Sequence, residues 1–114
     1  MRILLTNDDG IYAAGIAAIN KTLKEIGEVV VVAPEAERSG ASHSITWAHP
    51  LRLRKTYIEN KFFGYAVSGS PADCVKMAAM EIMKEPPELV VSGINLGANT
   101  GIHVLYSGTV AASI

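Results

Sequence analysis

The sequence predicts an α/β fold, a Rossmann-like three-layer α/β/α arrangement with a mostly parallel sheet and a hairpin excursion around residues 46–68. Short, uniformly apolar segments at 2–6, 29–33 and 89–91 are typical of buried parallel strands. A helical repeat of apolar residues lies between the first two segments, and the connections are short. This order indicates a strand–helix–strand unit with a right-handed crossover.

The first predicted strand covers residues 2–6, and an amphipathic helix is expected to follow it. Gly27 stands where the residue after a helix end is expected. Residues 29–33 are then too uniformly apolar and β-branched for a surface strand, which favours an interior position. The apolar face of the predicted helix consists of Ile16, Ile19, Leu23 and Ile26.

The middle of the chain is expected to leave the parallel pattern. Residues 46–57 mix β-forming residues with charged ones, and Leu51 and Leu53 alternate with arginines as in a half-exposed strand. Residues 62–68 predict a second short strand, and 59–61 are typical of a turn. We therefore expect a hairpin at this point.

A second helix is predicted to begin after Ser70, which is a suitable N-cap residue. Pro71 fits the first turn and Asp73 complements the positive end of the helix dipole. The apolar stripe includes Val75, Ala78, Ala79, Ile82 and Met83, with Cys74 packed beside it. The prolines at 86–87 are expected to end this helix.

The last part of the chain is predicted to form a strand at 89–91, a glycine- and asparagine-rich loop at 92–101 and a helix that opens after Tyr106. That helix would have no cap before the chain stops at Ile114. We therefore expect a single Rossmann-like domain over residues 1–114, truncated at its C-terminal end.

Composition excludes several classes of function. The 114 residues are 49% hydrophobic with a formal net charge of −1, so there is no basic footprint for duplex nucleic acid or an anionic membrane. Cys74 is the single cysteine, which excludes an intrachain disulfide and fits a reducing, cytoplasmic setting. No signal peptide and no membrane-spanning apolar run are expected.

Asp8 and Asp9 are the most informative residues, because they directly follow the first strand. Ligands bind outside the carboxyl ends of the strands in open α/β sheets, and two adjacent carboxylates repel each other unless a positive charge lies beside them. A divalent cation such as Mg²⁺ or Mn²⁺ is the simplest candidate. A polar turn at Asp9 and Gly10 is the alternative interpretation.

Three further polar clusters are expected to meet the aspartates at this edge of the sheet. They are Ser39 with Gly40, Asn95 with Asn99, and Ser107 with Gly108 and Thr109. Neutral oxygen donors beside carboxylates form a site for a hard cation, and a Ser-Gly-Thr sequence at a helix start offers hydroxyl and N–H groups to phosphate. An ordinary helix cap is the alternative for 107–109, and a loop of unusual backbone angles explains the glycines of 92–101 equally well.

Seven motifs carry a resemblance to a known family. The chain resembles the N-terminal part of the survival protein E (SurE) family, the stationary-phase survival proteins. The matching stretches are 6–10 (TNDDG), 32–34 (VAP), 37–39 (ERS), 43–46 (HSIT), 69–75 (GSPADCV), 92–101 (SGINLGANTG) and 106–110 (YSGTV). They cover nearly the whole chain in the family's order.

The resemblance implies a metal-dependent phosphatase that hydrolyses nucleoside 5′-monophosphates, with a Rossmann-like N-terminal region and dimers or tetramers in the full-length form. It implies the metal ligands Asp8, Asp9, Ser39 and Asn95, and the active-site loop residues Asn99, Ser107, Gly108 and Thr109. We expect catalytic roles for Asp8, Asp9, Asn95 and Ser107, and phosphate or substrate binding by Ser39, Gly40, Asn99, Ser107, Gly108 and Thr109. Family members are longer than this chain.

Two mechanisms remain open for such a site: in-line attack by water, or an aspartyl-phosphate route through Asp8 or Asp9. The alternative function is a non-catalytic domain, either receiver-like or devoted to oligomerisation. A receiver would need an acceptor aspartate after residues 89–91, where Ser92 and Gly93 stand. A haloacid-dehalogenase-type phosphatase would need an aspartate at Gly10, and the dinucleotide fingerprint is absent after the first strand.

Overall fold

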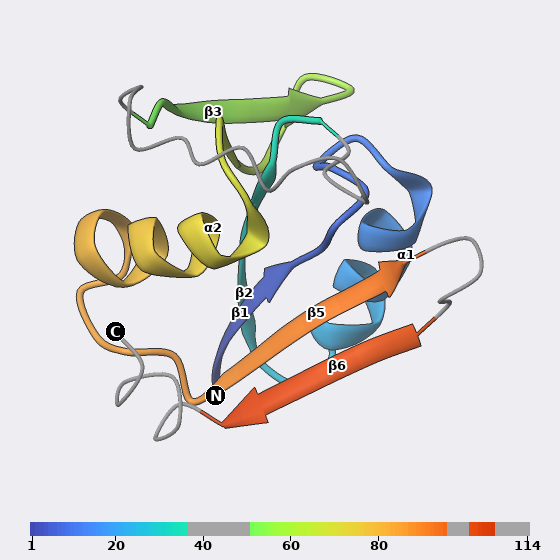
Figure 1. Ribbon diagram of the computed structural model, residues 1–114. Helices are drawn as coiled ribbons and strands as arrows, with labels where there is room; N and C mark the ends of the chain where they lie inside the picture. Colours follow the sequence, from blue (N-terminus) through green and yellow to red (C-terminus); the bar gives the residue numbers. More distant parts are fainter. Residues whose placement is uncertain (37–50, 96–100, 107–114) are drawn as a thin grey trace.

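A mixed six-stranded sheet is the centre of the computed structural model, which describes residues 1–36, 51–95 and 101–106 (Figure 1). The elements are β1 (Arg2–Thr6), α1 (Ala14–Leu23), β2 (Glu28–Pro34), β3 (Leu53–Ile58), β4 (Lys61–Val67), α2 (Pro71–Met77), the π-helical turn η2 (Ala78–Ile82), β5 (Leu89–Asn95) and β6 (Gly101–Tyr106). The strand order across the sheet is β3-β4-β2-β1-β5-β6.

The inner strands are parallel and the two outermost are not. β1 pairs in parallel with β2 and with β5, and β2 pairs in parallel with β4. The edge strands β3 and β6 are antiparallel to β4 and β5. The prediction of a mostly parallel α/β sheet is confirmed.

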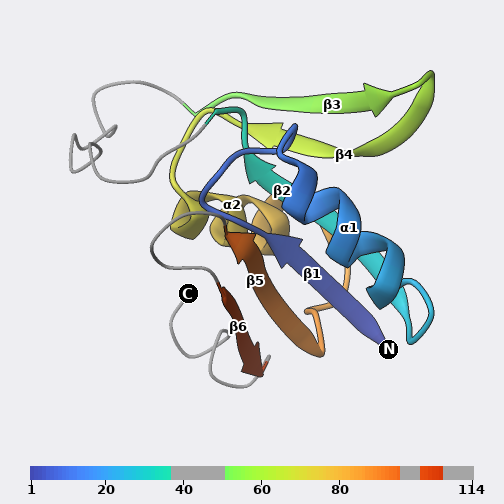
Figure 2. The ribbon, with the colours of Figure 1, turned by 90° about the vertical axis from the view of Figure 1, so that its right-hand side faces the viewer.

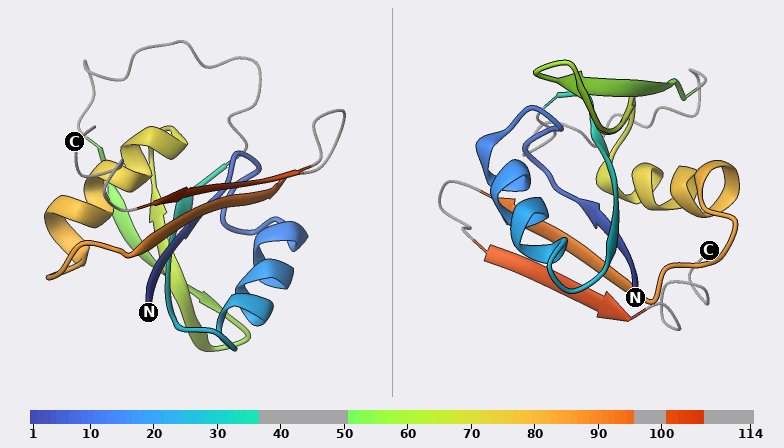
Figure 3. Two further views of the ribbon diagram at one scale, coloured as in Figure 1. Left: turned by 90° about the horizontal axis from the view of Figure 1, so that it is seen from below. Right: turned by 180° about the vertical axis from the view of Figure 1, so that it is seen from behind.

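Two hydrophobic clusters lie on opposite faces of the sheet, with one helix over each face (Figure 3). Successive residues of β1 point to opposite sides, so Ile3 and Leu5 contact the α1 face while Leu4 contacts the α2 face. All three of these side chains are fully buried. Figure 2 shows α1 in front of the sheet and α2 behind it, which is the predicted three-layer arrangement.

Helix α1 is shorter than its sequence pattern indicates. Ile16, Ile19 and Leu23 are buried as predicted, but the helix ends at Leu23 and the side chain of Ile26 is 60% exposed. Gly27 is needed for a different reason from the predicted helix end. A Cβ atom there would collide with the carbonyl oxygen of Met1, so the glycine allows the start of β2 to approach the first residue of the chain.

The predicted hairpin is present, but its first strand is shorter than expected. β3 begins at Leu53, and the part of the predicted strand at 46–50 lies outside the described residues. Glu59 and Asn60 form the two-residue turn, with φ values of 52° and 66°. Both central residues of a type I′ turn have positive φ, which matches the twist of a hairpin.

Helix α2 begins as the sequence predicts. The Ser70 hydroxyl accepts a hydrogen bond from the Asp73 amide at 3.2 Å, and the Ser70 amide donates to the Asp73 carboxylate at 2.9 Å. This is a reciprocal capping box. The helical segment ends at Ile82, four residues before the prolines, because η2 is a π-helical turn closed by the bond from the Met83 amide to the Ala78 carbonyl at 2.8 Å.

The expectation of a loop over 92–101 is wrong at both ends. β5 continues to Asn95, and β6 begins at Gly101. Antiparallel pairing with β6 supplies hydrogen-bond partners for the backbone of β5. The pairing is irregular between Ser92 and Asn95, where Gly93 lies. The predicted final helix lies outside the described residues. Within the described part of the chain, no helix is long and apolar enough to cross a membrane.

Candidate metal and phosphate site

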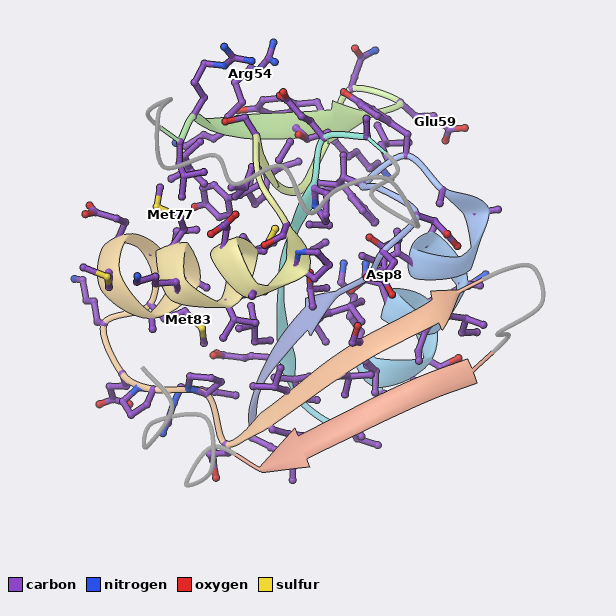
Figure 4. All side chains as sticks on the ribbon, viewed as in Figure 1. Asp8, Arg54, Glu59, Met77 and Met83 are labelled. Atoms are coloured by element: carbon purple, nitrogen blue, oxygen red, sulfur yellow. The ribbon has the colours of Figure 1, made fainter. Side chains whose placement is uncertain are left out.

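The sheet has a topological switch point between β1 and β5, where the order of the strands along the chain reverses. The chain passes from β1 through α1 to β2 on one side, and it returns later through α2 to β5 on the other side of β1. The carboxyl ends of the two strands at such a switch point leave a crevice in which α/β proteins bind ligands. Asp8 and Asp9 follow β1 at this position, and Asn95 is the last residue of β5. Asp8 lies near the ends of these two strands in Figure 4.

The side chain of Asn7 holds the turn that carries the aspartates. Its Nδ2 donates to the Gly10 carbonyl at 2.9 Å, and its Oδ1 accepts from the Gly10 amide at 3.1 Å. Asn7 is fully buried, while Asp8 and Asp9 are half-buried. Gly10 has a φ of 104°, a conformation that side chains strongly disfavour. The turn is therefore anchored from inside and presents its carboxylates at the edge of the sheet.

One hydrogen bond and one close backbone approach position the turn and the helix that follows it. The Ile11 amide donates to the Pro34 carbonyl at 2.8 Å, which ties the turn to the carboxyl end of β2. On the other side, Gly15 in the first turn of α1 lies so close to the Ile94 carbonyl oxygen that a Cβ atom would collide with it. The aspartate turn is thus tied to the carboxyl end of β2, and the helix that follows the turn packs closely on the carboxyl end of β5.

The donor chemistry of this edge fits a hard divalent cation. Two adjacent carboxylates are anchored at the switch point, and the nearby Thr6 hydroxyl is buried without a hydrogen-bond partner among the described residues. Oxygen atoms of this kind are the ligands that Mg²⁺ and Mn²⁺ prefer. Among the described residues, no group of three or more His, Cys, Asp or Glu side chains gathers. Neutral donors would therefore have to complete a cation shell around the two aspartates.

The structure brings three of the predicted site residues to one edge: Asp8, Asp9 and the backbone of Asn95. The remaining ones lie outside the described residues: Ser39, Gly40, Asn99, Ser107, Gly108 and Thr109. Tyr106, the last described residue, pairs with Leu89 at the amino end of β5. The predicted meeting of all four clusters therefore stays a prediction.

Sequence reasoning missed Glu35, which directly follows β2 at the same edge. Its carboxylate accepts hydrogen bonds from Arg54 at 2.8 Å and from Arg52 at 3.2 Å. The hydrogen bond from Arg54 lowers the pKa of Glu35, burial opposes this effect, and Arg52 adds to it. In the sequence, the alternation of arginines at 52 and 54 indicates only a half-exposed strand. Its second meaning, two cations on one face of a hairpin, could have pointed to an acidic partner.

Described residues line cavities of similar size at opposite edges of the sheet. One, of about 330 Å³, is lined by residues that include Tyr12, Glu35 and Arg54, at the carboxyl edge. The other, of about 320 Å³, is lined by residues that include Arg2, Glu28 and Lys84, at the amino edge. The first cavity therefore lies on the same edge as the aspartate turn.

Comparison with known proteins gives a consistent result. The family model described as "Survival protein SurE" matches residues 3–114. A protein named 5′-nucleotidase SurE from Syntrophobacter fumaroxidans is 56% identical over 113 residues, which cover 99% of this chain and 45% of that protein. The protein of the same name from Rhodopirellula baltica is 56% identical over 115 residues, covering 100% of this chain and 46% of that protein.

The fold comparison agrees with the sequence comparison. The crystal structure of the SurE protein from Aquifex aeolicus superposes with a TM-score of 0.74 at 43% sequence identity. The match covers 89% of this chain and 40% of that one. The chain therefore spans less than half of the length of these relatives.

Proposed function

Because this chain belongs to the survival protein SurE family, we propose that it carries the metal and phosphate site of a 5′-nucleotidase. The proposed reaction is hydrolysis of a nucleoside 5′-monophosphate to the nucleoside and phosphate. Relatives at 56% identity that bear this name support the proposal. The observation that carries it is the anchored Asp8–Asp9 pair at the switch point between β1 and β5.

We assign the holding of one Mg²⁺ or Mn²⁺ ion to Asp8 and Asp9, with Ser39 and Asn95 as further ligands. When bound, the ion neutralises charge on the phosphoryl oxygens and lowers the pKa of water. Asp8, Asp9, Asn95 and Ser107 are the proposed catalytic residues. Ser39, Gly40, Asn99, Ser107, Gly108 and Thr109 are proposed to bind phosphate oxygens through hydroxyl, amide and backbone N–H groups.

The chemical step joins one oxygen of the nucleophile to phosphorus and breaks the bond from phosphorus to the 5′-oxygen, which leaves with a proton as the nucleoside. Either water or the carboxylate of Asp8 or Asp9 can be that nucleophile. Water supplies the proton for the 5′-oxygen itself, whereas on the carboxylate route that proton comes from solvent. A water molecule then hydrolyses the aspartyl phosphate to release phosphate and restore the carboxylate. Rapid acid quench during turnover of ³²P-labelled substrate separates the two routes. Label retained on the protein supports the aspartyl-phosphate route, and its absence supports direct attack by water.

The assay for the proposal measures phosphate release from a panel of nucleoside 5′-monophosphates, with Mn²⁺ or Mg²⁺ and with EDTA. We expect metal-dependent turnover that falls more than about 100-fold in Asp9→Asn, because even groups outside the ligand shell contribute about 10- to 100-fold. Glu81→Gln is the matched control, since it removes an exposed carboxylate on η2. Turnover that resists both EDTA and Asp9→Asn would contradict the proposal.

Three further properties belong to the proposal. We expect residues 1–114 to act as a single Rossmann-like domain, and the protein to form homodimers or homotetramers in the cytoplasm. Exposed large apolar side chains on the described part of the chain, among them Ile26, Phe62 and Met80, support an oligomer that buries additional surface. Analytical ultracentrifugation tests the oligomeric state, and a monomer at micromolar concentration would contradict it.

A further inference from the structure

The cavity at the carboxyl edge lies close to the aspartate turn, because Tyr12, one of the residues that line it, follows that turn in the chain. Tyr12 is the third residue after Asp9, and three residues span at most about 10 Å. Ile11 is fully buried in the core, whereas the Tyr12 side chain is 69% exposed. Because Ile11 is also bonded to Pro34, Tyr12 is held next to Glu35, and both residues line the cavity.

The residues that line this cavity include an aromatic ring (Tyr12), a carboxylate (Glu35) and two small side chains. Thr56 and Ala66 are buried and carry small side chains. The cavity volume of about 330 Å³ lies at the lower end of the range for small-molecule sites. An exposed aromatic ring offers a stacking surface for any base.

Glu35 is oriented rather than mobile, because Arg52 and Arg54 bond different oxygens of its carboxylate. Its side chain is 23% exposed, and an ionised carboxylate offers about four acceptor positions, of which these bonds occupy two. In dinucleotide-binding α/β folds, an acidic residue about 20 residues beyond the phosphate loop bonds the ribose hydroxyls. Glu35 directly follows β2, 25 residues beyond Gly10, so it occupies the corresponding place.

We infer that this cavity is the nucleoside subsite, in which Tyr12 stacks on the base and Glu35 accepts hydrogen bonds from the ribose hydroxyls. The inference rests on the proposed function, because the aspartate turn next to it would hold the phosphate. Lys55, which also lines the cavity, places a positive charge beside the substrate anion. Stacking is tolerant of base identity, so the subsite selects ribonucleosides as a class rather than one base.

The test measures binding of adenosine, 2′,3′-dideoxyadenosine and inorganic phosphate to the purified protein by calorimetry in the presence of Mn²⁺. Tyr12→Ala is expected to weaken the binding of both nucleosides by about 5- to 150-fold. Glu35→Gln is expected to weaken adenosine by about 10- to 150-fold and to leave dideoxyadenosine unchanged, since it removes a charged acceptor. Tyr57→Ala, which removes an exposed ring on β3 outside the cavity, should change neither.

The comparison of two nucleosides within one variant guards against a change that is merely structural, because loss of fold would weaken both. Equal affinity of Tyr12→Ala and the wild type for adenosine would overturn the inference, as would failure of the wild type to bind adenosine. Phosphate binding is the separate readout for the proposed function. If phosphate failed to bind while adenosine responded as expected, the proposed function would fail, and the cavity would be a nucleoside site with no phosphate site beside it.

Discussion

Thr6 at the end of β1 pairs in register with Ser92 of β5. Asp8 and Asp9 lie two and three residues beyond Thr6, in the turn after β1, and Asn95 lies three residues beyond Ser92, at the end of β5. Buried side chains such as Leu5 and Val91 fix the register of this parallel pair. The register in turn determines which polar residues lie side by side beyond the ends of β1 and β5. The site depends on the register of the sheet as much as on the aspartates themselves.

Asn7→Ala should destabilise the protein by about 1–3 kcal/mol, because the buried Gly10 amide loses its acceptor while the Gly10 carbonyl keeps the bond from the Ala13 amide. Urea unfolding measures the change. Asn20→Ala is the matched control, since Asn20 is also buried but its Oδ1 has no partner among the described residues. Equal destabilisation by the two substitutions would show that the turn does not depend on Asn7.

Gly15→Ala should lower the free energy of unfolding, although alanine in place of a helical glycine normally stabilises by about 1 kcal/mol. The added Cβ would collide with the Ile94 carbonyl oxygen, which is backbone and cannot rotate away. The sign of the change, read from thermal or urea unfolding, is the test. A stabilised variant would mean that α1 does not pack closely on the carboxyl end of β5.

Glu35 should add stability that depends on pH. Its pKa is lowered in the folded state, so this stability is fully present above the ordinary glutamate value of 4.5 and is lost as the pH falls through the lowered pKa. Arg54→Ala should move the pKa of Glu35 back toward 4.5 and cost at most about 1 kcal/mol, since the Arg54 side chain is 69% exposed.

NMR titration of the Glu35 carboxyl carbon measures this pKa directly. Lys55→Ala is the control, because Lys55 is an exposed neighbouring cation of β3 that does not contribute to the lowered pKa of Glu35. A Glu35 pKa that stays unchanged in Arg54→Ala, or one that moves equally in Lys55→Ala, would contradict the assignment to Arg54. Figure 4 shows Arg54 on β3, at the outer edge of the sheet.

The interior of the fold could be predicted from sequence because burial leaves a periodic pattern. The segments that became β1, β2 and β5 are apolar runs, and Ser70 with Pro71 and Asp73 is a local helix start. Predictions from such local patterns fail where the role of a residue comes from a distant part of the chain. Gly27 looked like a helix end, but its role comes from contact with Met1, a residue far away in the chain.

The candidate site was predictable where it follows a strand and unpredictable where it depends on pairing across the sheet. Asp8 and Asp9 are adjacent in sequence and end an apolar run, so their place followed from the pattern. Glu35 acquires its role from Arg52 and Arg54, which reach it only because β4 pairs with both β2 and β3. β6 could not be predicted from its own residues, because the sequence before it is rich in glycine and asparagine and is typical of a loop. The hydrogen bonds that make it a strand come from its pairing with β5.

Calorimetric titration of Mn²⁺ into the purified protein tests directly whether the Asp8–Asp9 turn holds a divalent cation. We expect one site in the wild type, loss of that site in Asp9→Asn, and wild-type affinity in Glu81→Gln. Metal binding is measured here without turnover, so the result does not depend on substrate. Wild-type Mn²⁺ affinity in Asp9→Asn, or a folded wild type that binds no Mn²⁺, would contradict the assignment of the site.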